Sequence, residues 1–149
     1  MKKNKKLLIL VNDLSFFISH RLPIAEAALV KKYDVVIGYG ELGGGDLNSL
    51  VSKGLKSKHI PMHRGGMNPL RDLATFFYIW KFIKEEKPDI SHMVTIKPYL
   101  YGGIISRLMG VKSLVSAVSG LGSLFIRKDI KTRFLRLLLY PFYKLAFSH

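Results

Sequence analysis

The sequence predicts an α/β fold in which a doubly wound parallel sheet is flanked by helices. Two short runs, Leu7–Val11 and Val35–Tyr39, are almost continuously apolar, which is typical of parallel strands buried on both faces. Segments with helical spacing follow these runs, and the alternation continues along the chain. Strands that alternate with helices join through right-handed crossovers into one parallel sheet.

The composition restricts the possible classes of function. A chain of 149 residues with 48% hydrophobic residues is long enough for one domain with a real core. The chain has no cysteine, which excludes disulfides, thiolate metal sites and cysteine nucleophiles. The five histidines have no metal-ligand spacing, so no metal site is expected. The net charge of +14 favours anionic partners, although a soluble basic protein without such a partner is the alternative.

The first half of the chain begins with a strand at Leu7–Val11. The preceding lysines suggest a secretory signal, but the apolar run ends at Asn12, too early for its hydrophobic region. We expect a loop over Asn12–Phe17 and then a helix over His20–Lys32, with Pro23 in its first turn. The other elements expected in this half are strand Val35–Tyr39, helix Leu47–Lys53 capped by Asp46, and strand Lys56–Ile60.

A long helix follows, capped by Asn68 and running to about Glu86. One side of it carries Leu70, Leu73, Phe77, Trp80 and Lys84, and further apolar residues at 76, 79, 82 and 83 widen the apolar surface nearly all round. Such a helix is buried on two sides, or it meets a partner or a membrane. No segment approaches the roughly 20 apolar residues of a membrane span.

The remaining elements expected are strand Ile90–Val94, helix Pro98–Gly110, strand Ser113–Val118 and helix Ile130–His149, broken at Pro141. The last helix is basic on one face and apolar on the other, which favours a membrane surface or a partner; packing on the sheet is the alternative. The chain ends within this apolar helical pattern, so we expect it to be a fragment of something longer.

The familiar nucleotide and hydrolase signatures are absent. Strand one is not followed by G-x-G-x-x-G, and no P-loop, G-x-S-x-G or H-E-x-x-H motif occurs. Function must therefore be sought in the polar residues at the carboxyl ends of the strands, where open α/β sheets bind ligands.

Three loops supply such residues. His20 and Arg21 stand at an expected helix start beyond strand one, and Arg64 lies in a loop with two glycines after strand three. After strand four come Thr95 and Lys97, and Lys97 precedes a helix start, where a phosphate would meet both a cation and backbone donors. Helix capping, surface ion pairs and ordinary mobile loops are the alternative explanations.

Two further positions complete the candidates. His92, within strand four, has either a chemical role or a structural role as a hydrogen-bonded core residue. After strand five, Ser119, Gly120 and Gly122 would allow a sugar or nucleotide to approach the backbone closely.

Several of these segments together resemble the N-terminal domain of bacterial family 4 glycosyltransferases, in the subgroup acting in surface-polysaccharide assembly. The matching segments are Val11–Pro23, Met67–Leu73, Lys87–Asp89 with His92, Thr95–Pro98 with Tyr101 and Gly102, and Ser119–Gly122. They occur in the expected order and cover essentially the whole chain.

The resemblance implies one Rossmann-like half of a GT-B enzyme, with residues 1–149 as the N-terminal, acceptor-side domain and the C-terminal donor-binding domain absent from this chain. Family members are typically retaining and need no metal, and the nucleotide-sugar is a co-substrate, so no cofactor is expected. The acceptor is often a polyprenyl-diphosphate-linked saccharide.

This chain departs from the family at two places. A Gly-Gly turn that many members carry after strand one is Asp13-Leu14-Ser15 here, and a histidine after strand five is replaced by Ser119 and Gly120. The candidate catalytic residues are therefore His92 and His20.

We accordingly expect the acceptor-binding domain of a retaining hexosyl transferase, working in the cytoplasm at the inner face of the cytoplasmic membrane and inactive in isolation. Its expected partners are a lipid-linked saccharide, a nucleotide-sugar held through the missing domain, and an anionic membrane surface. Arg21, Arg64 and Lys97 would hold phosphate charge, while Thr95, Ser119, Gly120 and Gly122 would line the sugar path and Asn68 would also bind substrate.

The alternatives are a non-catalytic basic α/β binding module, or a separate subunit that pairs with a catalytic domain. Nucleic acid is not expected as a partner, because the aromatic residues cluster in apolar helical stripes rather than alternating with basic residues.

Overall fold

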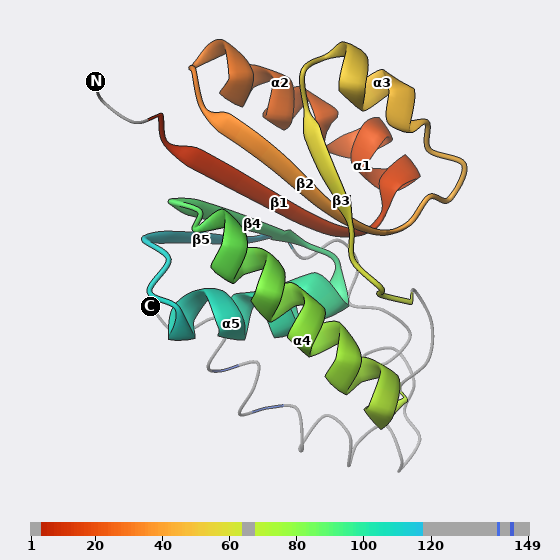
Figure 1. The fold of residues 1–149 in the computed structure, drawn as a ribbon, viewed down its shortest axis with the longest axis vertical. Helices are drawn as coiled ribbons and strands as arrows, with labels where there is room; N and C mark the ends of the chain where they lie inside the picture. Colours follow the sequence, from red (N-terminus) through yellow and green to blue (C-terminus); the bar gives the residue numbers. More distant parts are fainter. Residues whose placement is uncertain (1–3, 64–67, 118–139, 141–143, 145–149) are drawn as a thin grey trace.

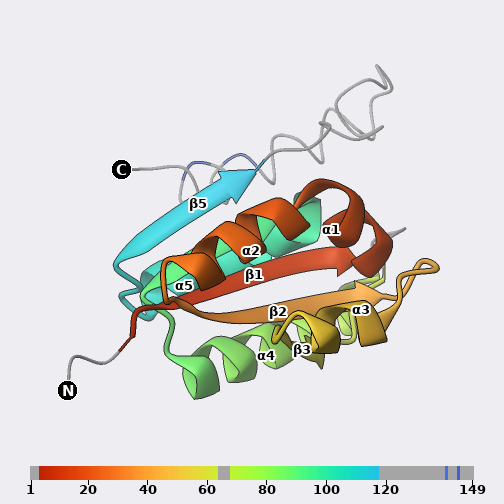
Figure 2. The ribbon, with the colours of Figure 1, turned by 90° about the horizontal axis from the view of Figure 1, so that it is seen from above.

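The computed structural model describes residues 4–63, 68–117, 140 and 144. Its centre is a five-stranded parallel sheet with the strand order β3-β2-β1-β4-β5 (Figure 1). Helices cover both faces of this sheet (Figure 2). The predicted doubly wound α/β fold is confirmed.

The strands are β1 (Lys6–Asp13), β2 (Asp34–Glu41), β3 (Lys56–His59), β4 (Ile90–Val94) and β5 (Ser113–Ala117). The helices are α1 (Leu14–His20), α2 (Leu22–Val30), α3 (Leu47–Ser52), α4 (Pro69–Glu86) and α5 (Gly103–Leu108), and a π-helical turn η1 (Pro98–Gly102) leads directly into α5.

The core consists of two apolar layers, one on each face of the sheet. Successive side chains of a strand point to opposite faces, so Ile9 and Val11 of β1 pack beneath α1, α2 and α3, whereas Leu8 and Leu10 pack against α4, η1 and α5. A strand that must fill both layers needs apolar residues at every position, which is why the run Leu7–Val11 was informative.

The region after β1 differs from the predicted loop and single helix. The strand continues to Asp13, whose carboxylate caps α1 by accepting hydrogen bonds from the Phe16 N–H at 3.0 Å and the Ser15 hydroxyl at 2.6 Å. The helix then breaks at Arg21, because Pro23 in the first turn of α2 has no N–H to continue the ladder. The predicted helix start at His20 is wrong: this residue ends a helix.

The second half agrees closely with the predictions. Asn68 caps α4, with its Oδ1 accepting from the N–H groups of Leu70 and Arg71, and β4 has the predicted bounds. The helical segment expected over Pro98–Gly110 begins as the turn η1, and Gly110 follows α5 with φ +68°. Val118 and the expected helix Ile130–His149, apart from residues 140 and 144, lie outside the described residues.

None of the described helices has both the length and the apolar character that crossing a membrane requires.

Candidate functional site

The strand order places the candidate site between β1 and β4. The chain order reverses there, since β1 is bordered by β2 on one side and by β4 on the other. In open α/β sheets ligands bind at the carboxyl ends of the strands beside such a reversal. Asn12 lies near the end of β1, and Thr95 directly follows β4.

Asn12 and Thr95 are joined side chain to side chain. The Thr95 hydroxyl lies 2.9 Å from Asn12 Oδ1, to which it donates, and it also contacts the carbonyl oxygen of Val94. Thr95 has φ +72°, a left-handed conformation that is a genuine outlier for a β-branched residue. Such strain costs about 1–3 kcal/mol and persists where the surrounding structure holds it, which is common at ligand sites.

Lys97 forms an ion pair with an aspartate of α4. Its Nζ lies 2.8 Å from Asp72 Oδ1, and the two side chains are only 15% and 12% exposed. The Tyr101 hydroxyl donates to the same carboxylate, and burial, with the charge of Asp72, raises the pKa of Tyr101 to about 12. Lys97 therefore has an internal anion as partner, and its expected contact with substrate phosphate stays a prediction.

His92 lies inside the sheet rather than at the rim. Its backbone pairs with Ile9 in the middle of β1, and the residue is 7% exposed. Burial lowers its pKa below the usual 6.5, the charge of Arg21 lowers it further, and a hydrogen bond to the Val115 backbone opposes the shift. The imidazole is thus neutral at neutral pH, and its Nε2 and the Nε of Arg21 are buried with no hydrogen-bond partner among the described residues.

The other predicted candidates are spread more widely. His20 is exposed at the end of α1, stacked on Phe16 with ring centroids 4.5 Å apart. Asn68 is exposed and serves as the α4 cap. Arg64, Ser119, Gly120 and Gly122 lie outside the described residues. The structure thus brings together Thr95 and Lys97 after β4, while it places His20 and His92 away from that rim.

Asp13 changes the chemistry at the start of α1. Its buried carboxylate caps this helix, where many family members carry a Gly-Gly turn. A Cβ on Gly43 would meet the Asp13 carboxylate at 2.5 Å, so the loop after β2 closes over it. A phosphate is therefore disfavoured at this helix start by the chain's own negative charge.

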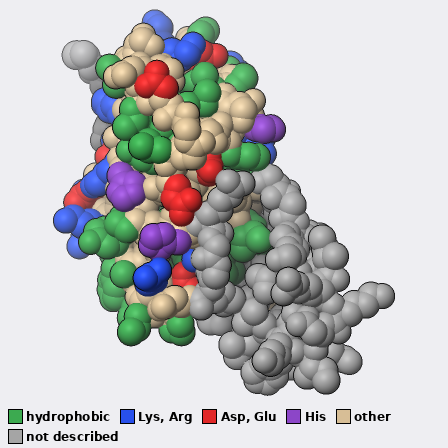
Figure 3. Space-filling view, turned by 90° about the vertical axis from the view of Figure 1, so that its right-hand side faces the viewer, with side chains coloured by type: hydrophobic (Ala, Val, Ile, Leu, Met, Phe, Trp, Pro, Cys, Tyr) green, Lys and Arg blue, Asp and Glu red, His purple; other side chains and the backbone are tan. Residues whose placement is uncertain are grey.

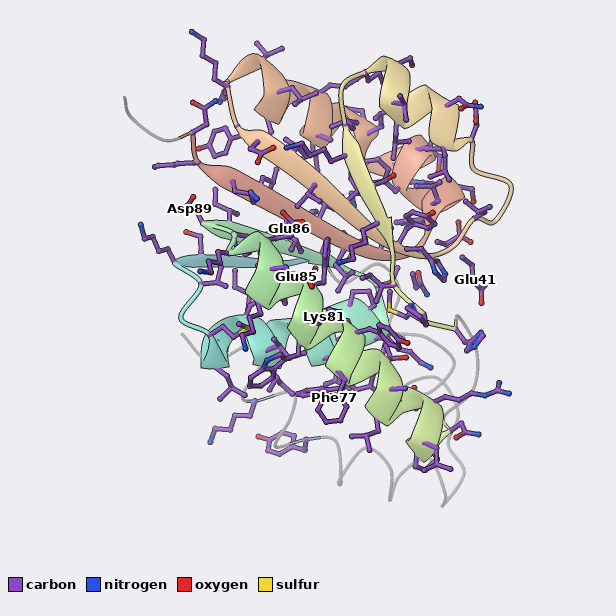
Figure 4. All side chains as sticks on the ribbon, viewed as in Figure 1. Glu41, Phe77, Lys81, Glu85, Glu86 and Asp89 are labelled. Atoms are coloured by element: carbon purple, nitrogen blue, oxygen red, sulfur yellow. The ribbon has the colours of Figure 1, made fainter. Side chains whose placement is uncertain are left out.

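The outer side of α4 is apolar and exposed. Leu70, Leu73 and Phe77 are 81%, 55% and 62% exposed, and Tyr78 and Trp80 are also exposed. Figure 4 shows Phe77 pointing away from the sheet, and Figure 3 shows hydrophobic side chains at the lower edge of the described surface, with basic, acidic and histidine side chains beside them. We call Leu70, Leu73 and Phe77 the α4 stripe; Arg71, Lys81 and Lys84 lie on the same helix and are exposed.

Three residues of this region were missed by the sequence analysis as site residues: Asn12, Asp72 and Tyr101. Asn12 directly follows a predicted strand, and a polar residue at the carboxyl end of a strand is a sequence signal for a ligand site. Asp72 and Tyr101 meet Lys97 only through tertiary contacts. Within the described ranges no group of three or more His, Asp or Glu side chains is arranged to hold a metal ion.

Comparison with known proteins shows the family to which this chain belongs. Residues 6–149 match the model of the family described as "Glycosyl transferase 4-like", so the chain belongs to that family. The fold is Rossmann-like, as in one half of a GT-B glycosyltransferase, and the resemblance to bacterial family 4 glycosyltransferases is confirmed.

A relative from Campylobacter jejuni, N,N'-diacetylbacillosaminyl-diphospho-undecaprenol alpha-1,3-N-acetylgalactosaminyltransferase, is 27% identical over 130 residues. The match covers 86% of this chain and 34% of the relative, so the chain spans about a third of that protein's length.

Two solved structures show the same fold. A glycosyltransferase from Rickettsia africae is 16% identical with a TM-score of 0.58, covering 96% of this chain and 41% of its own. A putative UDP-N-acetylglucosamine 2-epimerase from Listeria monocytogenes is 14% identical with a TM-score of 0.64, covering 93% and 38%.

Proposed function

We propose that this chain is the acceptor-side domain of a retaining glycosyltransferase, which moves a hexosyl group from a nucleotide-sugar to a lipid-linked saccharide. One observation carries the proposal: the polar rim of Asn12 and Thr95 adjoins the helix that bears the exposed α4 stripe. The Lys97–Asp72 ion pair directly connects the two. A ligand with a polar saccharide head and an apolar lipid matches such an arrangement. The Campylobacter jejuni relative, by its name, acts on a diphospho-undecaprenol-linked sugar.

The proposed roles follow the chemistry of the side chains. Asn12 and Thr95 offer amide and hydroxyl groups, which suit the hydroxyls of a sugar. Arg21, Arg64 and Lys97 are proposed to hold phosphate charge, and Ser119, Gly120 and Gly122 to line the path of the sugar. His92 and His20 remain the candidate catalytic histidines. His92 has the neutral ring that a general base requires, but its burial means that substrate would need to reach it through an opening.

The transfer itself is tested with the full-length gene product, a labelled nucleotide-sugar and a prenyl-diphosphate-linked saccharide. We expect labelled lipid with retention at the anomeric carbon, unchanged by EDTA because no metal is expected. Asn12→Ala should lower kcat/KM for the acceptor about tenfold, since a lost hydrogen bond to a substrate hydroxyl costs about 1–1.5 kcal/mol. Asn4→Ala, two residues before the start of β1 and exposed, is the matched control. Transfer that is indifferent to Asn12→Ala would contradict the assignment of the rim.

The proposed site of action is the inner face of the cytoplasmic membrane, with the α4 stripe against the lipid. Exposed apolar residues beside basic ones favour an anionic bilayer, where each basic residue contributes about 1 kcal/mol. The formal net charge of +14 supports the same partner.

Membrane contact is tested by co-sedimentation with vesicles that contain or lack anionic phospholipid. We expect binding to anionic vesicles that weakens with salt and that Leu73→Asp or Phe77→Asp reduces. Val51→Asp is the matched control, because Val51 is a 70% exposed apolar residue on α3. Equal loss of binding in all three variants would mean that added negative charge, rather than the α4 stripe, is responsible.

A further inference from the structure

Asp72 joins two parts of the molecule that are separate in the sequence. It lies in the first turn of α4, and its carboxylate accepts from Lys97 Nζ at 2.8 Å and from the Tyr101 hydroxyl. Lys97 immediately precedes η1, and Tyr101 lies within it. The aspartate therefore holds the start of the helical segment after β4 against the start of α4.

This ion pair is the least exposed of those that α4 forms within the described part of the chain, followed by Lys6–Glu86 with side chains 21% and 25% exposed. Lys58 and Glu85 also form a close pair, between β3 and the last turn of α4, but both side chains are 44% exposed (Figure 4). Exposed pairs contribute little, whereas removal of one partner from a largely buried pair leaves an uncompensated charge. The Lys97–Asp72 pair thus constrains two backbone segments, the first turn of α4 and the residues that lead into η1.

The backbone so constrained includes the strained rim residue. Lys97 is two residues beyond Thr95, and the Tyr99 N–H donates to the Thr95 carbonyl at 3.1 Å. On the other side, the Thr95 hydroxyl is held by Asn12. A left-handed threonine persists only where its surroundings determine its conformation, and Asn12 and Asp72 anchor it from its two sides.

The base of α4 is fixed in turn. Thr75, one helical turn beyond Asp72, is buried, and its hydroxyl lies 2.8 Å from the carbonyl oxygen of Pro61 in the segment after β3. The ring of Phe76 packs edge-on against that of Tyr101, with centroids 6.3 Å apart. Asp72 therefore acts on a helix that is already held in place, so its two bonds set the position of the Lys97–Tyr101 segment.

We propose that Asp72 is a positioning residue, which acts through Lys97 and Tyr101 to hold Thr95 at a fixed position relative to the α4 stripe. This inference rests on the proposed function, since an acceptor with a polar head and an apolar lipid must meet both surfaces at once. Misplacement of a substrate-positioning group by about 1 Å can cost a hundredfold in rate, so a rigid link between these surfaces has a direct kinetic consequence.

The test is a double-mutant cycle in the full-length gene product, with Asp72→Asn, Lys97→Met and the double variant. We expect Asp72→Asn to raise the acceptor KM about tenfold while the donor KM stays unchanged. In the Lys97→Met background it should cause little further loss, because a residue that acts through another is non-additive with it. Asp72→Glu, which keeps the charge, should recover most of the affinity for acceptor. Glu85→Gln, the same change of charge on the same helix, is the matched control.

A second readout is independent of activity. Backbone hydrogen exchange over residues 95–101 should quicken in Asp72→Asn and in the milder Tyr101→Phe, but not in Glu85→Gln. If Asp72→Asn does not fold, Tyr101→Phe, which removes a single hydrogen bond, provides both the exchange and the kinetic measurement, with a smaller rise in acceptor KM.

Three results would overturn the inference: wild-type kinetics and exchange in Asp72→Asn, additive losses in the double variant, or tighter acceptor binding on removal of the carboxylate. The last would mean that Asp72 merely masks Lys97. If the wild-type protein transfers no sugar to any lipid-linked acceptor, the proposed function fails instead, and the exchange measurement still decides whether Asp72 positions residues 95–101.

Discussion

Replacing Thr95 by alanine and by glycine separates the cost of its backbone conformation from the value of its hydrogen bond. Both variants lose the 2.9 Å bond to Asn12, worth about 1 kcal/mol. Only alanine keeps the penalty of φ +72°, which is about 1–2 kcal/mol for a residue with a Cβ. Glycine avoids that penalty but loses about 0.4–1 kcal/mol through the greater entropy of its unfolded chain.

These magnitudes predict that the glycine variant is more stable than the alanine variant at position 95, the opposite of the usual order within a helix. Thr95→Ala should be about 1 kcal/mol less stable than the wild type, and Thr95→Gly should be more stable than Thr95→Ala by about 0.5–1 kcal/mol. At an ordinary helical position the order is the reverse, so Ala74→Gly in α4 should destabilise by about 1 kcal/mol.

Urea denaturation followed by circular dichroism measures all three variants. A Thr95→Ala protein as stable as Thr95→Gly would refute the reasoning, because it would show that residue 95 carries no left-handed strain. Thr95→Ser keeps the hydroxyl, so it should retain most of the transfer activity that both other variants lose.

Three further predictions concern other parts of the fold. The folded-state pKa of His92 is depressed, so its contribution to stability is present above pH 6.5 and is lost as pH falls toward the folded pKa. The free energy of unfolding, measured in urea at several pH values, should therefore depend less steeply on pH over this range in His92→Gln than in the wild type, and an unchanged slope would contradict this. A Cβ at Gly40 would meet the backbone carbonyls of Met62 and Asn12, the latter at 2.7 Å, whereas a Cβ at Gly44 would have open space around it. Gly40→Ala should therefore destabilise the fold by more than Gly44→Ala, which should cost about 1 kcal/mol through its positive φ alone. Equal melting temperatures of the two variants would contradict this. Asn68→Ala should lower stability by about 1 kcal/mol in urea and Asn68→Asp should restore it, and an activity loss in the aspartate variant would reveal a role in substrate binding beyond the cap.

The sequence predicted correctly those helices and strands whose starts and ends are set by a few adjacent residues. The bounds of β4 and the capped start of α4 were confirmed, because a short strand between Asp89 and Thr95 and an Asn-Pro helix start both depend on a few adjacent residues. The prediction failed between Asn12 and His20. There, Asp13 as a side-chain cap starts a helix immediately after the strand, within a stretch that was interpreted as a loop.

The α4 helix shows a different limit. Its sequence is apolar nearly all round, so periodicity cannot say which side faces the sheet. In the structure Ile79, Phe82 and Ile83 are buried while Leu73 and Phe77 are exposed. A right-handed crossover from β3 to β4 fixes the face of the sheet that α4 covers. Packing against the apolar residues of that face then buries Ile79, Phe82 and Ile83.

The sequence by itself therefore determined the fold class, the order of the elements and the family resemblance. These follow from neighbouring residues within single strands and helices, because neighbouring side chains decide backbone conformation and burial on a sheet. The rim required contacts between distant residues: Thr95 meets Asn12 across 83 positions, and Lys97 meets Asp72 across 25. No local spacing encodes such pairs, because they exist only once the parallel sheet has brought the carboxyl ends of β1 and β4 together and packed α4 beside them.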